Sequence, residues 1–147
     1  MPRLLTLLAL LALLCFAITA HAEPLKDKEA VGKATDQFLT AATDGDIAKA
    51  YAGIRNAVGV DVEAFDNSGD KAAGYFKKVF EQVGKPLAWD RVRTEHIKDH
   101  LLRITYLQKF QQAALFWEFT FYQPTEGWSL VNISYGTDLS HLYEPVK

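Results

Sequence analysis

Residues 113–123 read AALFWEFTFYQ, and this stretch decides the fold. Its residues alternate with a period of two, which is typical of a β-strand whose side chains point to opposite faces of a sheet. One face would carry Leu115, Trp117, Phe119 and Phe121, and the other Phe116, Glu118, Thr120 and Tyr122. Because both faces include aromatic side chains, we expect an inner strand that is covered on both sides.

The same period continues on either side of this stretch and predicts four strands in the second half of the chain. They are expected at residues 87–96, 101–111, 113–123 and 128–135, which are rich in aromatic and β-branched residues. The segments that separate them are short. Short connections favour antiparallel neighbours, so the pattern predicts an antiparallel meander.

The first half of the chain has helical periodicity instead. Residues 27–43 predict a first helix, with Asp27 placed to cap its start. Asp46 is placed to cap a second helix that has one apolar face. That face consists of Ile47, Ala50, Tyr51 and Ile54.

A third helix is predicted by the apolar spacing of residues 73–83, and Gly84 followed by Pro86 is a typical helix end. Before it, residues 66–70 (DNSGD) have the composition of a turn. Residues 57–65 show no clear period, and we expect them to form a loop anchored by its valines.

Helices followed by a meander belong to the α+β class. The sequence therefore predicts three N-terminal helices packed on a strongly bent four-stranded antiparallel sheet, which together form a cone-shaped roll. A bent sheet is needed because so much aromatic surface has to be buried against the helices.

The N-terminus indicates export. Arg3 precedes an apolar run from residue 4 to residue 18, and Ala20-His21-Ala22 ends it with a small residue on each side of the histidine. This order is that of a secretory signal peptide at residues 1–22. We expect a protein of the periplasm if the host is Gram-negative and a secreted protein otherwise. Residues 23–147 would form a single domain.

Composition excludes several classes of function. The only cysteine, Cys15, and the only methionine, Met1, both lie in the predicted signal peptide. The exported chain would therefore have no disulfide and no cysteine site. With 18 acidic and 16 basic residues, the chain lacks the basic surface of a nucleic-acid binder. No membrane association is expected once the signal peptide is removed.

Two stretches carry a resemblance to a known family. The segment from Phe38-Leu39 through Gly45-Asp46 to Ala50-Tyr51 is similar to the helix, Gly-Asp, helix opening of the nuclear transport factor 2-like superfamily. Residues 119–124 (FTFYQP) and 127–130 (GWSL) resemble the last two strands of its small exported bacterial members. The resemblance implies a cystatin-like cone fold with a space between helices and sheet. Members use that space for ligand binding, isomerase or dehydratase chemistry, or protein association.

No catalytic set can be assigned from the residues. An isomerase of this kind needs a carboxylate base inside an apolar cavity, and the strand carboxylates that we consider for this role are Glu95 and Glu118. The alternation places Glu118 on the face opposite Trp117, so pairing with a strand arginine is the favoured interpretation. His96 and His100 flank a turn, which disfavours a metal site. We therefore expect neither a metal nor a cofactor.

Aromatic residues that carry a polar group are the best candidates for a ligand pocket. We select Tyr51, Trp89, Tyr106 and Trp117. Three functions follow in order of preference: a non-enzymatic binder of a small apolar ligand, a module that forms a homodimer or binds a partner through the outer sheet face, and an isomerase or hydratase.

Export leads to the first prediction. Mass spectrometry of the protein from its native host should show Glu23 as the first residue, because cleavage is expected after Ala22. An intact N-terminus embedded in the membrane would contradict it.

Overall fold

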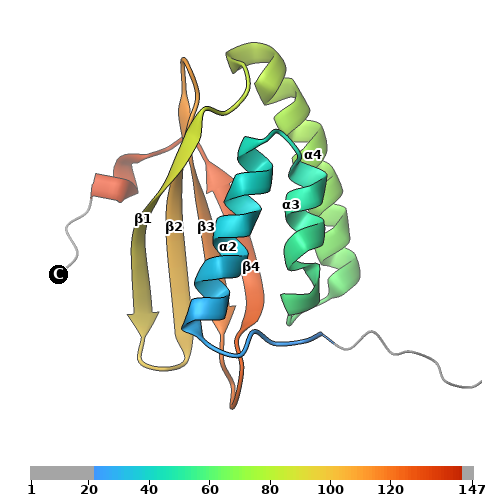
Figure 1. Ribbon diagram of the computed structural model, residues 1–147, viewed down its shortest axis with the longest axis vertical. Helices are drawn as coiled ribbons and strands as arrows, with labels where there is room; N and C mark the ends of the chain where they lie inside the picture. The colour runs from blue at the N-terminus through green and yellow to red at the C-terminus, as the bar shows by residue number, and fades with distance from the viewer. Residues whose placement is uncertain (1–21, 144–147) are drawn as a thin grey trace, which may run out of the picture.

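The computed structural model describes residues 22–143 and has the α+β architecture that the sequence predicts (Figure 1). Within these residues three α-helices precede four strands. The helices are α2 (Lys28–Thr43), α3 (Ile47–Ile54) and α4 (Val62–Val83), and the strands are β1 (Ala88–Ile97), β2 (Leu101–Lys109), β3 (Ala114–Tyr122) and β4 (Ser129–Gly136). Two 3₁₀ turns are η1 (Arg55–Ala57) and η2 (Ser140–Tyr143). The predicted signal peptide lies outside the described residues, except for Ala22.

The sheet confirms the antiparallel meander. Its strand order is β1-β2-β3-β4, with each strand antiparallel to the next. The sheet is curled but not closed, and the helices cover one of its faces (Figure 1). The pairing register shifts at two places. One shift lies between Arg91 and Arg93 where β1 pairs with β2, and the other lies between Thr120 and Phe121 where β3 pairs with β4.

The two faces of β3 also match the predicted alternation. Leu115, Trp117, Phe119 and Phe121 are buried under the helices. On the outer face, Phe116, Glu118 and Thr120 are half-buried, and Tyr122 is 43% exposed. The 3₁₀ turn η2 covers part of this face, where the ring of His141 meets that of Phe116 at 4.6 Å between centroids.

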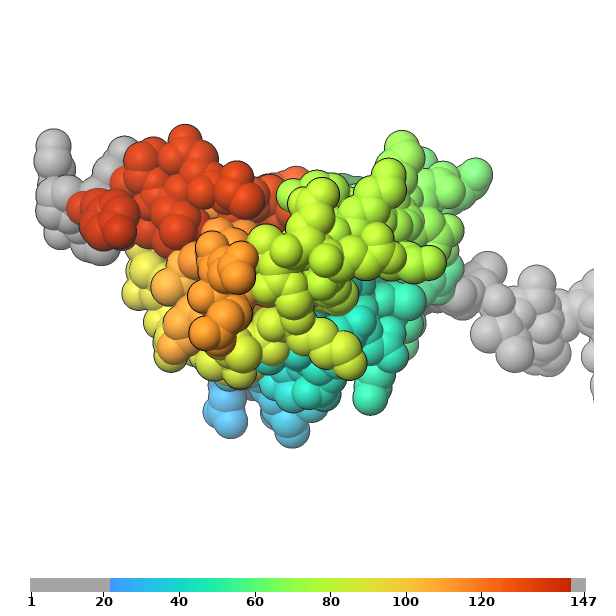
Figure 2. Space-filling model, turned by 90° about the horizontal axis from the view of Figure 1, so that it is seen from above, coloured from blue at the N-terminus to red at the C-terminus, as the bar shows by residue number. Residues whose placement is uncertain are grey.

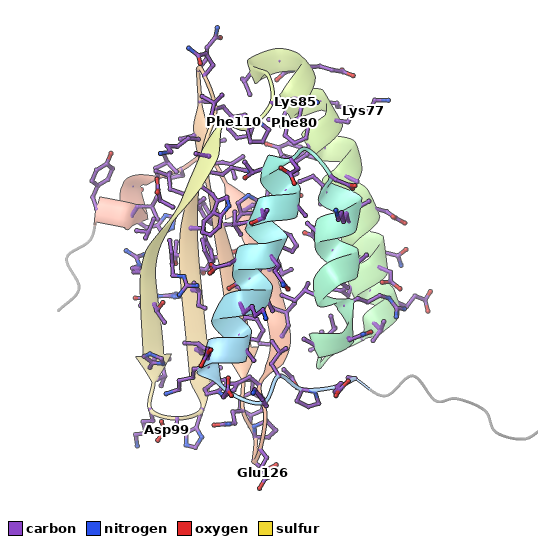
Figure 3. The ribbon with its side chains drawn as sticks, viewed as in Figure 1. Lys77, Phe80, Lys85, Asp99, Phe110 and Glu126 are labelled. Carbon is purple, nitrogen blue, oxygen red and sulfur yellow. The ribbon has the colours of Figure 1, made fainter. Side chains whose placement is uncertain are left out.

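The helices pack on the sheet through aromatic side chains. Trp117 stacks on Phe76 of α4 at 5.0 Å between ring centroids, and Phe38 of α2 meets it edge-on at 5.1 Å. At one end of the molecule, the ring centroids of Phe80 and Phe110 are 6.1 Å apart (Figure 3). Figure 2 shows this end from above, with the orange β2–β3 turn against the yellow-green C-terminal part of α4. Side chains therefore close this end.

Aspartates start the first two helices, as the sequence predicts. The Asp27 carboxylate accepts a hydrogen bond from the Ala30 N–H (2.7 Å), and the Asp46 carboxylate accepts one from the Lys49 N–H (2.9 Å). Each bond satisfies a backbone donor that has no partner inside its helix. All four predicted residues of the apolar face of α3 are buried.

The prediction for residues 57–70 was partly wrong. The turn expected at 66–70 lies inside α4, and the expected loop ends at Asp61, which caps the helix. Asp66 is held by Arg55, whose Nε and Nη2 both donate to its carboxylate at 2.8 Å. Gly69 packs directly against the ring of Tyr51. Tertiary contacts have overridden the local turn propensity.

The close contact at Gly69 allows a test with a matched control. A Cβ on Gly69 would lie 2.9 Å from Cδ1 of the buried Tyr51, whereas one on Gly74 of the same helix would meet nothing within 4 Å. We expect Gly69→Ala to lower the free energy of unfolding by roughly 1–3 kcal/mol through overpacking. Gly74→Ala should raise it by roughly 0.5–1 kcal/mol, because alanine favours the helix. Urea unfolding measures both changes, and equal effects of the two variants would contradict this account of α4.

Candidate functional site

The four selected aromatic residues do not surround one cavity. Trp117 and Tyr106 are fully buried in the core, and Trp89 on β1 is half-buried with its ring 5.6 Å from that of Tyr106. Tyr51 lies on α3 and is 5% exposed. Of the four, only Tyr51 contributes to the pockets described below.

Tyr106 belongs to a polar cluster that joins α2 to the sheet. Its hydroxyl donates to Asp36 Oδ1 (2.8 Å) and lies 2.6 Å from the Thr35 hydroxyl. Arg91 of β1 donates to both oxygens of Asp36, at 2.7 and 2.8 Å, and to the carbonyl of Gly32 (3.3 Å). Burial raises the pKa of Tyr106, which keeps its hydroxyl a donor. The cluster acts as a structural tie.

Sequence reasoning missed two members of this tie. Asp36 and Arg91 are 55 positions apart, and no local spacing relates them. The segment around Asp36 reads Lys33-Ala34-Thr35-Asp36-Gln37, so one more polar residue gave no signal there.

Trp117 also has a buried polar partner. Its Nε1–H donates to Gln108 Oε1 (2.9 Å), and Gln108 Nε2 donates to the Thr43 hydroxyl at the end of α2 (3.1 Å). Among the described residues, every fully buried side-chain nitrogen or oxygen atom has a hydrogen-bond partner. The interior therefore offers no unpaired polar group to a substrate.

Glu95 and Glu118, the two carboxylates considered as bases, lie on the outer face of the sheet. Glu95 is bound by Arg103 (2.9 Å) and Arg93 (3.3 Å), and Arg103 holds the pKa of Glu95 below its usual value. Glu118, whose side chain is 17% exposed, lies 3.9 Å from Arg103 and accepts a long hydrogen bond from Thr105. Both carboxylates thus pair with strand arginines.

The structure describes neither a metal centre nor a spanning helix. Within residues 22–143, no three His, Cys, Asp or Glu side chains are grouped so that they would hold a metal ion. No helix in the same range has both the length and the apolar character needed to cross a bilayer.

An apolar pocket of about 190 Å³ lies between α4 and β4, and we call it the α4–β4 pocket. Its lining comes from three segments that are far apart in the chain. They supply Tyr51 from α3, Val58, Val60, Asp61, Ala64, Phe65 and Ser68 from η1 to α4, and Leu130, Val131, Asn132 and Ile133 from β4.

Gly59 explains how this pocket forms. The Gly59 N–H donates to the Leu130 carbonyl (2.9 Å), and Val58 bridges to Leu130 as a short parallel pair. A Cβ on Gly59 would overlap Cβ of Ser129, so only glycine allows this approach. The contact places Val58 and Val60 beside β4, and Asp61 then starts α4.

Polar groups occupy only a small part of the pocket. Burial raises the pKa of Tyr51, with Tyr135 acting in the same direction and a hydrogen bond with Ser68 opposing it. The Tyr51 hydroxyl in the wall is thus neutral. Asp61, Ser68 and Asn132 are the exposed polar members of the lining.

Two other hollows lie beside α2 and α3. One, of about 340 Å³, is lined by both helices and includes Gln37, Thr40, Asp44 and Lys49; the other, of about 330 Å³, extends to residues 23–26. Alanine and glycine make up most of their apolar lining, whereas the α4–β4 pocket is lined by Phe65, Leu130 and Ile133.

Comparisons of the chain with protein-family models, curated proteins and solved structures gave no match. The assignment of function therefore depends on the geometry of the site.

Mutation of Tyr106 tests whether the hydrogen bonds of its hydroxyl stabilise the fold. Tyr106→Phe should lower the free energy of unfolding by about 1 kcal/mol, because the hydroxyl that joins Thr35 to Asp36 is lost. Tyr122→Phe removes an exposed hydroxyl on the opposite face and should change stability by less than about 0.5 kcal/mol. Urea unfolding of both variants checks this prediction, which fails if the two behave alike.

Proposed function

We propose that the protein is a non-enzymatic binder of a small, mainly apolar molecule, and that the α4–β4 pocket is its binding site. One observation carries the proposal: the pocket combines bulky apolar side chains from α4 and β4 with a few polar groups. Such a combination is typical of ligand sites, in which apolar walls provide affinity and a few polar groups set orientation.

The size of the pocket limits the ligand. Its volume of about 190 Å³ is slightly larger than the roughly 150 Å³ of an engineered cavity that holds benzene. A single ring with a short substituent fits this volume. The packed aromatic interior supports a site at the edge of the core rather than deep within the cone, so we assign Trp89, Tyr106 and Trp117 to packing and keep only Tyr51 as a ligand contact.

The alternative functions have less support. General base catalysis requires a carboxylate aimed at a substrate in a cavity, whereas Glu95 and Glu118 pair with arginines on the outer face. An association surface on that face would include the apolar row Ile97, Leu101 and Tyr122, but charged side chains cross the next rows and η2 covers Phe116.

The wider setting is also part of the proposal. We infer an exported protein with a nuclear transport factor 2-like cone. The order of three helices and a curled four-stranded meander supports the cone, and the pattern of residues 1–22 in the sequence supports export.

A substitution that places a large side chain in the pocket tests the proposal. A ligand at one hundred times its dissociation constant should stabilise the fold by about 2.7 kcal/mol, so a screen of one-ring apolar compounds should raise the melting temperature. Ala64→Phe should abolish this response, because a phenyl ring on exposed Ala64 occupies the pocket.

The matched control is Ala52→Phe, an exposed helical alanine outside the pocket lining. It should keep the response. If Ala64→Phe responds to the compounds as strongly as Ala52→Phe, the α4–β4 pocket is not the binding site.

A further inference from the structure

We propose that the ligand of the α4–β4 pocket is a small amphipathic cation, such as an ammonium group on a ring-sized apolar body, and that Asp61 receives its charge. This inference rests on the proposed function and adds the chemical class of the ligand. It follows from the charges around the pocket and from the hydrogen bonds that Asp61 already makes.

Asp61 is the only acidic member of the pocket lining, and no lysine, arginine or histidine accompanies it there. Its Oδ1 accepts from the N–H groups of Glu63 (2.9 Å) and Ala64 (3.2 Å). Within the described residues these are the hydrogen bonds of its carboxylate, so Oδ2 has unused acceptor capacity. The residue is exposed, which leaves that oxygen accessible to a ligand.

A helix N-terminus ordinarily attracts anions through its free N–H groups, but at the start of α4 the carboxylate of Asp61 already binds such groups. The Asp61 carboxylate accepts from the second and third N–H groups of α4, those of Glu63 and Ala64, and the Phe65 N–H donates to the Asp61 carbonyl (3.0 Å). An anionic ligand would find a carboxylate at the place where free donors would otherwise lie.

The neighbouring charges reinforce this preference. Glu63 and Asp70 add negative charge to the first half of α4, where Lys71 adds one positive charge. The nearby Arg55 donates from Nε and Nη2 to Asp66, so its charge is paired. The local field beside the pocket is therefore negative, and it favours a cation that can leave its apolar part against Phe65, Leu130 and Ile133.

Three probes of one size separate charge from apolar contact: benzylamine, benzyl alcohol and benzoate. Their dissociation constants are measured at pH 7 and low salt from backbone amide shifts in an NMR titration. Because Asp61 is exposed, we expect benzylamine to bind roughly two- to fivefold more tightly than benzyl alcohol and benzoate to bind most weakly. The preference should shrink in about 0.5 M salt, because salt at that concentration strongly screens the attraction between exposed charges.

Asp61→Asn is the decisive variant. Asparagine caps a helix as well as aspartate does, so the variant should unfold at the same urea concentration as the unmodified protein. Benzylamine should then bind the variant no more tightly than benzyl alcohol does. Glu81→Gln removes an exposed charge near the other end of α4, outside the pocket lining, and should keep the advantage of benzylamine.

The outcomes distinguish the two proposals. Equal binding of the three probes, or a benzylamine preference that persists in Asp61→Asn, overturns the cation inference while leaving the pocket as a ligand site. If none of the probes shifts the amides of Val58, Phe65 or Leu130, the α4–β4 pocket is not a binding site and both proposals fail.

Discussion

The contact of Trp117 with two helices is the constraint on which the rest of the structure depends. Its ring lies nearly parallel to that of Phe76, at 15°, and edge-on to that of Phe38, at 67°. Its one polar atom has to find a partner when buried, and Gln108 on the neighbouring strand supplies it. Because Gln108 also binds Thr43, the register between β2 and β3 and the end of α2 are determined together.

A core filled in this way decides where a ligand site can form. Close-packed aromatic rings leave few voids large enough for another molecule, so open space arises where packing changes from one element to another. The segment between η1 and α4 makes such a change, because Gly59 holds the chain against β4 just before α4 begins at Val62. The α4–β4 pocket lies at this junction.

Local signals in the sequence predicted most of the fold. Asp27 and Asp46 act within one helical turn, and the period of two along β3 reports burial directly, so each was visible in a short window. The segment 66–70 was misassigned because its turn-forming residues are held in a helix by Arg55 and Tyr51, which lie earlier in the chain. The pocket was not predictable for the same reason: residues 58–68 meet residues 130–133 only after folding.

The two long helices are attached to the sheet by different kinds of interaction. Hydrogen bonds from Tyr106 and Arg91 to Asp36 hold α2, and these bonds depend strongly on direction. Contacts of α4 with the sheet are aromatic, between Phe76 and Trp117 and between Phe80 and Phe110, and no hydrogen bond or ion pair joins the described residues of α4 to a strand. Aromatic pairs tolerate a wider range of distances and angles. A ligand beside α4 would therefore disturb fewer directional bonds than one beside α2, and this supports the proposed site on the α4 side of the sheet.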